Sequence, residues 1–265
     1  TVTPLGYILP VPSIPPPPTR HLHELLTEQV GAWRADGYRS PEAPAIAEVL
    51  EWARGDGDGS TRFLRAAQLA ALETYWYLRL VRHTPGILAL YRKLYPSQRD
   101  LRVALGLTAD ALRDLVEESG LDALLERVKT DDQLVRDFKL EALRESLTLD
   151  YPSYILALAM GAGKTILIGA IIATEFAMAL EYPGGPFVQN ALVFAPGTTI
   201  ILSLRELLEI PWQRILPPRL HGAFAASVKF TFTRDGATSI DVIEGSTFNV
   251  VVTNTEKIRI QKESI

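Results

Sequence analysis

The apolar residues of the first 150 positions recur at intervals of three and four, which is typical of helices buried along one face. Polar and charged residues fill the positions between them. Glycine, proline and capping residues divide the pattern into separate segments. The spacing predicts helices over 19–33, 44–54, 60–82 and most of 84–149.

The pattern changes at about residue 151, where short continuous apolar runs begin. These runs predict buried strands at 154–160, 191–195, 227–234, 239–243 and 248–253. Helical spacing fills 164–180 and 199–210, and Asp235-Gly236 indicates a hairpin between the third and fourth runs. Alternation of strands and helices is typical of a parallel sheet covered on both faces. We therefore expect an α/β fold, preceded by and elaborated with an all-helical region.

Composition excludes several classes of function. With 47% hydrophobic and 22% charged residues, the 265-residue chain can bury a core of ordinary size. It has no cysteine, which excludes disulfides and thiolate metal sites and suits a reducing, cytoplasmic location. The net charge of −4 means that no global basic field would hold nucleic acid, so such contacts would have to be local.

One apolar stretch, 154–180, is about as long as a membrane span. Lys164 lies in its middle beside two glycines, and Glu175 follows. Because a lysine at mid-bilayer is costly, we interpret the stretch as a buried strand, a turn and a buried helix, and expect no membrane partner.

Residues 1–18 form a proline-rich segment that contains Pro10, Pro12 and the run 15–18. Such a sequence is extended or polyproline-like. It is either a plain tail or a ligand for a proline-reading module.

The residues with the clearest chemistry are Gly161-Ala162-Gly163-Lys164-Thr165, between the predicted strand and the next helix. Small residues there let backbone N–H groups surround a phosphate, and the helix N-terminus adds further donors. The lysine of such a loop reaches the β- and γ-phosphates, and the threonine hydroxyl holds Mg²⁺. We expect ATP and Mg²⁺ as cofactors, with Lys164 and Thr165 catalytic and the loop 160–165 binding the nucleotide.

Ala159–Thr165 also resembles motif I of superfamily 2 helicases, in which the early glycine that Leu158 replaces here is not required. Phe63–Thr74 looks like the segment that carries the adenine-reading glutamine of these proteins. The resemblance implies a P-loop NTPase (RecA-like) sheet domain in which Gln68 hydrogen-bonds the adenine edge.

Two later segments extend the resemblance to nucleic-acid contacts. Leu192–Thr199 is similar to motif Ia, and Asn249–Lys257 resembles a later motif at the end of a strand. By this match the residues that contact nucleic acid are Pro196, Gly197, Thr198, Thr253, Asn254 and Lys257.

The resemblance can be narrowed by two dipeptides, Glu73-Thr74 and Pro196-Gly197. The segments that contain them look like those of the restriction subunits of type III restriction enzymes and their DEAD/DEAH-like relatives. The resemblance implies an ATP-dependent helicase or translocase that acts on DNA, and it extends to the protein subunits of a restriction or phage-defence complex as partners. Residues 151–265 would form an incomplete RecA-like domain, and 84–149 would be a helical insertion after the glutamine segment 60–82.

The sequence contains no Asp-Glu motif II before Ile265. Because ATP hydrolysis needs such an acid to hold Mg²⁺, we expect the N-terminal portion of a longer motor that hydrolyses little by itself. Two alternatives stay open. One is a P-loop switch or kinase that does not act on nucleic acid, and the other is a helical interaction module with a degenerate nucleotide site.

Overall fold

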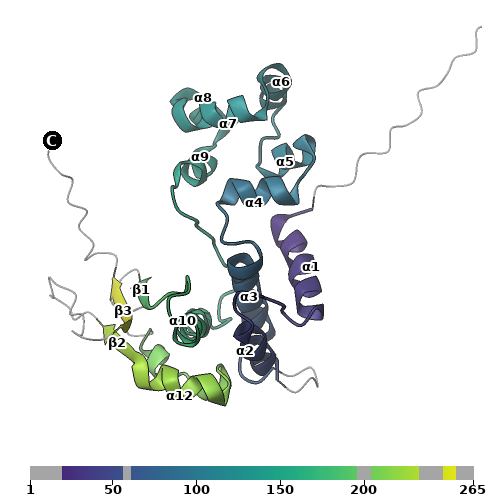
Figure 1. Ribbon diagram of the computed structural model, residues 1–265. Coiled ribbons are helices and arrows are strands. Elements are labelled where there is room, and N and C mark those ends of the chain that lie inside the picture. The colour runs from purple at the N-terminus through teal and green to yellow at the C-terminus, as the bar shows by residue number, and fades with distance from the viewer. Residues whose placement is uncertain (1–19, 56–60, 196–203, 233–246, 255–265) are drawn as a thin grey trace, which may run out of the picture. The chain divides into compact units, whose positions relative to one another are not determined.

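The computed structural model describes residues 20–55, 61–195, 204–232 and 247–254 (Figure 1). The chain divides into two compact units. The first consists of residues 1–25 and 87–150, and the second of residues 26–86 and 151–265.

The first unit is helical, as the spacing of its apolar residues predicts. Leucine and valine side chains from successive helices fill its core, among them Leu112, Leu124 and Val128, each at most 1% exposed. Asp131 begins α8 by accepting a hydrogen bond from the N–H of Leu134 at 3.0 Å. The helices of this unit are α4 (Ile87–Leu94), α5 (Gln98–Ala104), α6 (Asp110–Ser119), α7 (Leu121–Thr130), α8 (Asp132–Phe138) and α9 (Glu141–Thr148).

The second unit combines helices with a parallel sheet. α1 (Leu22–Ala35) leads into it from the first unit. Its other helical elements are α2 (Ala45–Arg54), α3 (Ala66–Trp76), the π-helix η1 (Tyr77–Val81), α10 (Lys164–Glu181), the 3₁₀ turns η2 (Leu204–Glu209) and η3 (Trp212–Arg214), and α12 (Pro218–Ser227).

The described strands are β1 (Asn190–Ala195), β2 (Val228–Phe232) and β3 (Phe248–Asn254). They form one sheet in the order β1-β3-β2, and both pairings are parallel. Val250 and Val252 in the central strand are fully buried, which is typical of the middle of a parallel sheet. The expected class, α/β with a parallel sheet, is therefore confirmed in this general form.

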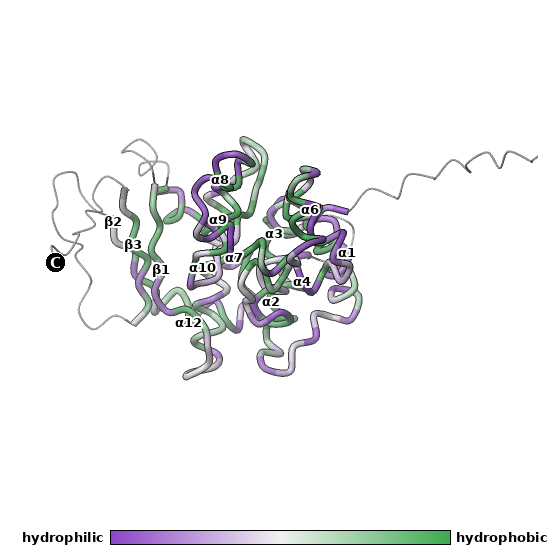
Figure 2. The backbone as a smooth tube through the Cα atoms, turned by 90° about the horizontal axis from the view of Figure 1, so that it is seen from above, coloured by the Kyte–Doolittle hydropathy of each residue, from purple (hydrophilic) through white to green (hydrophobic). Residues whose placement is uncertain are grey.

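Helices α10 and α12 lie on the same side of this sheet in both views of the backbone (Figures 1 and 2). The rings of Phe176 in α10 and Phe248 in β3 meet edge to face at 5.4 Å, and those of Trp212 and Phe230 stack at 6.1 Å. α10 also contacts α3 and α12, so it is covered on several sides. This explains why its sequence is apolar nearly all round rather than along one stripe.

Two sequence predictions for this unit are wrong. The strand predicted at 154–160 is absent, since these residues pair with none of β1, β3 and β2 in the described sheet; Ile155, which a buried strand would cover, is 91% exposed. The helix predicted over 60–82 begins at Ala66, because the side chain of Gln68 accepts a hydrogen bond from Arg65 N–H and caps the helix there.

Two other predictions lie partly outside the described residues. β2 covers part of the run 227–234 and pairs with β3 in parallel, whereas 239–243, the other half of the expected hairpin, is not described. Within the predicted helix 199–210, the described part is the short 3₁₀ turn η2.

A buried polar cluster joins α3 and η1 to α10. The carboxylate of Glu175, 2% exposed, accepts hydrogen bonds from Tyr75, from Arg79 at 2.8 Å and from the N–H of Val188 at 2.9 Å. Beside it, the indole of Trp76 donates to the Thr174 hydroxyl at 3.0 Å. A buried charge with several donors is stabilised only while those donors stay in place.

Across the parts of the chain that the structure describes, no helix has both the length and the apolar content that crossing a bilayer demands.

We expect Glu175→Ala to lower the free energy of unfolding by about 3–5 kcal/mol, because Arg79 and the Val188 N–H lose a buried acceptor. The matched control is Glu206→Ala, at an exposed position of η2, with a change within about 0.5 kcal/mol. Urea unfolding followed by tryptophan fluorescence measures both, since the four tryptophans all lie in the second unit. Equal effects of the two substitutions would contradict a structural role for this cluster.

Candidate nucleotide-binding site

The loop that precedes α10 has a tight conformation that depends on its glycines. Gly161 and Gly163 have φ angles of +74° and +77°, which side chains with a Cβ rarely adopt. The N–H of Ala162 donates to the carbonyl of Ala159 at 3.2 Å and closes the turn. Gly163 is then the N-cap of α10, which begins at Lys164.

Side chains at the N-terminus of α3 donate hydrogen bonds to the backbone carbonyls of this loop. The amide nitrogen of Gln68 donates to the carbonyls of Ala162 at 2.9 Å and Gly163 at 2.8 Å. The guanidinium of Arg65 donates to the carbonyl of Gly161 at 2.6 Å. Gln68 is 2% exposed, so its two loop contacts are shielded from water.

These contacts set the direction of the loop amides. Because a trans peptide unit is planar, the carbonyl of one residue and the N–H of the next point in opposite directions. Holding the carbonyls of Ala162 and Gly163 against α3 therefore turns the N–H groups of Gly163 and Lys164 away from α3. The loop thus presents backbone donors on the side opposite the Gln68 side chain.

The start of α10 adds to this set of donors. The first N–H groups of a helix have no acceptor within the helix, and the N-cap Gly163 has no side chain to supply one. Together with the helix dipole, such amides suit an anionic group. The residues of this loop therefore fit the phosphates of a nucleotide.

The side chains of the predicted site lie around this loop. Lys164 is exposed, and its ammonium group donates to the carbonyl of Ala159 at 3.2 Å. Thr165 is half-buried at the second position of α10. Met160 is 98% exposed beside the turn. The structure thus brings Gln68 together with the loop 160–165, although 92 positions separate Gln68 from Met160 (160 − 68).

Gln68 uses its amide group within the protein. Both of its N–H hydrogens have loop carbonyls as acceptors, and its oxygen accepts from the N–H of Arg65 at 2.7 Å. To hydrogen-bond the edge of an adenine base, Gln68 would have to use the second lone pair of that oxygen or release one of its contacts with the loop. Adenine recognition by Gln68 stays a prediction, whereas its contact with the loop is present in the structure.

Sequence reasoning missed Arg65 as a residue of this site. Its position three residues before Gln68 was the available signal, because residues three apart lie on the same side of a helix start.

The predicted nucleic-acid contacts are described only in part. Thr253 is 2% exposed in β3, and Asn254 ends this strand opposite Ala195 of β1. The carboxyl ends of two parallel strands therefore meet at one edge of the sheet. The remaining four residues, Pro196, Gly197, Thr198 and Lys257, lie outside the described residues.

Comparison of the chain with protein-family models, with curated proteins and with solved structures found no match.

We expect Gly163→Ala to destabilise the protein by about 1–3 kcal/mol, because the new side chain would require an unfavourable positive φ. Its Cβ would also lie 2.4 Å from the amide nitrogen of Gln68. Gly222→Ala in α12 is the matched control, with open space around the added carbon and a gain of about 0.5–1 kcal/mol. Urea unfolding compares the two, and a neutral Gly163→Ala would contradict the described loop geometry.

Proposed function

We propose that this chain binds the phosphates of ATP through the loop 160–165, as the ATP-binding part of a DNA-dependent ATPase of the helicase or translocase class. The observation that carries the proposal is the loop itself. Two left-handed glycines and the hydrogen bonds from α3 orient backbone donors at the start of α10, beside the exposed ammonium group of Lys164.

Each residue of the loop has a separate role in this proposal. The backbone amides bind the phosphate oxygens, and the ammonium group of Lys164 leaves the Ala159 carbonyl to neutralise the β- and γ-phosphates. The Thr165 hydroxyl is the group that would hold Mg²⁺, and the ion would offset the charge of the phosphates. Arg65 and Gln68 position the loop from α3.

The proposed action on DNA rests on fewer observations than the proposed binding of ATP. It rests on the resemblance of the segments around β1 and β3 to motifs that touch a nucleic-acid backbone, and on the adjacent ends of these two strands. A P-loop switch or kinase would need the same loop but no contact with DNA. The response of nucleotide binding to DNA therefore distinguishes the two classes.

We expect Lys164→Ala to weaken binding of a fluorescent ATP analogue with Mg²⁺ by about tenfold or more, since a charge-assisted contact with phosphate is worth about 1.5–3 kcal/mol. Lys93→Ala, at an exposed lysine of the first unit, should leave binding unchanged. Fluorescence anisotropy measures the dissociation constants, with and without duplex DNA.

Three outcomes distinguish the candidate functions. Binding that DNA strengthens and Lys164→Ala weakens supports the motor. Binding that needs Lys164 but is indifferent to DNA supports a switch or kinase. Binding that both lysine variants retain in full would contradict a phosphate site in this loop.

A further inference from the structure

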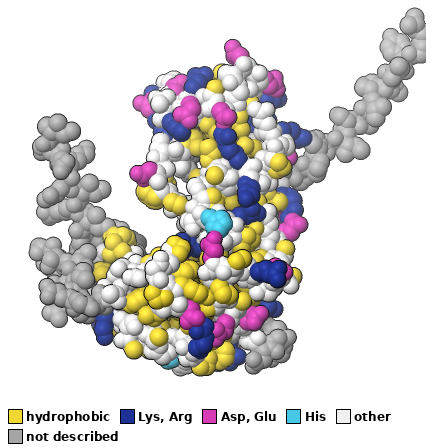
Figure 3. Space-filling view, viewed as in Figure 1, with side chains coloured by type: hydrophobic (Ala, Val, Ile, Leu, Met, Phe, Trp, Pro, Cys, Tyr) yellow, Lys and Arg dark blue, Asp and Glu magenta, His cyan; other side chains and the backbone are white. Residues whose placement is uncertain are grey.

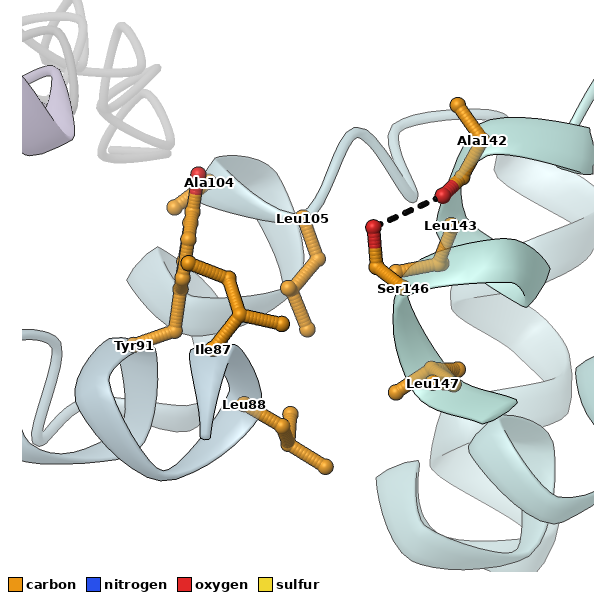
Figure 4. Close-up of a pocket in the computed structure, with 9 residues that line it drawn as sticks. All are labelled: Ile87, Leu88, Tyr91, Ala104, Leu105, Ala142, Leu143, Ser146 and Leu147. Atoms are coloured by element: carbon orange, nitrogen blue, oxygen red, sulfur yellow. Dashed lines mark hydrogen bonds between the residues drawn. The ribbon is translucent and has the colours of Figure 1, made fainter. Parts of the chain in front are cut away.

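An open apolar groove lies within the first unit, between α4 and α9, with α5 at its end (Figure 4). Ile87, Leu88 and Tyr91 project from α4, and Leu143 and Leu147 project from α9 toward them. The groove encloses about 220 Å³. It belongs to the first unit alone and is separate from the nucleotide site.

The lining of this groove is uncharged. Its polar side chains are Tyr91 and Ser146, and the hydroxyl of Ser146 already donates to the carbonyl of Ala142 at 2.9 Å. α9 contributes an apolar face to the groove although none of its residues is fully buried. Figure 3 shows hydrophobic side chains at the surface of the first unit, among charged ones. An exposed apolar surface of this kind is typical of an interaction site.

The N-terminal segment of the same chain has a matching composition. Residues 1–19 contain seven prolines and no charged side chain, and the apolar residues Leu5, Tyr7, Ile8 and Leu9 precede most of the prolines. Proline-rich chains bind apolar grooves lined by aromatic rings, because the polyproline conformation costs little further entropy on binding. An uncharged groove accepts such a segment without burying an unpaired charge.

Arg20, the first described residue after this segment, has a contact that leads to the groove. The hydroxyl of Tyr95 donates to the carbonyl of Arg20 at 2.7 Å. The ring of Tyr95 stacks on that of Tyr91, with 5.7 Å between their centroids, and Tyr91 lines the groove. Ten residues of polyproline chain have a length of about 30 Å.

We propose that the proline-rich segment 5–18 binds in the groove between α4 and α9 of its own chain. The Tyr91 ring and the leucines of α9 contact its proline rings. The segment thereby covers the apolar surface of the helical unit, and a proline-rich segment of another protein could compete for the same groove. This inference is independent of the proposed nucleotide site.

Disulfide trapping tests the proposal, because the chain has no cysteine of its own. Cysteine is introduced into the segment at Pro10, Pro12 or Pro15 in turn, and into α9 as Leu147→Cys inside the groove. The matched control is Glu145→Cys, which is exposed on the same helix and does not line the groove. The rates of disulfide formation in the full chain are then compared under the same mild oxidant.

We expect at least one segment position to form an intramolecular disulfide with position 147 about tenfold faster than with 145, because binding raises the local concentration of the tethered thiol. Tyr91→Ala should reduce this preference, and a free peptide of residues 5–18 at millimolar concentration should slow the reaction at 147. Unfolding midpoints of the reduced variants show whether each of them is folded.

Equal rates at 147 and 145 for all three segment positions would overturn the proposal. Disulfides that form only between chains would also overturn it, and would assign the groove to the segment of a second copy. A preference for 147 that Tyr91→Ala leaves unchanged would contradict the aromatic contact on which the proposal rests.

Discussion

The contact between α3 and α10 is the interaction on which the second unit depends. At one end of α3, Arg65 and Gln68 bind three successive carbonyls of the loop 161–163. At the other end, Trp76 and the residues around Glu175 bind α10 and the segment that leads to β1. The same contact therefore orients the loop amides and packs the helix that covers the sheet, so fold and candidate site are stabilised together.

Sequence reasoning predicted the parts of this arrangement that depend on local patterns. Among the described residues, the helical character of 20–55 and of 66–149, the helix after Gly163 and the apolar strands at 191–195 and 248–253 are confirmed. The motif also identified the loop. Sequence reasoning missed that Gln68 caps α3 and donates hydrogen bonds to the loop carbonyls, because this role depends on contacts between residues more than 90 positions apart. For the same reason the prediction of a strand at 154–160 is wrong, because a strand also requires a neighbouring strand that sequence periodicity does not show.

The two units present different kinds of surface. In the second, polar groups converge on a loop whose amides and lysine suit an anion. In the first, the groove between α4 and α9 is apolar and uncharged, and residues 1–19 of the same chain are proline-rich and carry no charged side chain. An anion would gain little from the groove and a proline-rich segment would gain little from the loop, so the two proposed sites differ in the chemistry of the ligand that each suits.

Hydrogen–deuterium exchange of the loop 159–166 with and without Mg-ATP tests the central claim most directly. If the amides turned away from α3 bind phosphate, saturating Mg-ATP should slow exchange in this loop and in the first turn of α10. At a concentration near the wild-type dissociation constant, Mg-ATP should protect the loop of Lys164→Ala far less than the wild-type loop. Exchange in the loop that is unchanged at saturating nucleotide, or protection confined to other segments, would contradict the account.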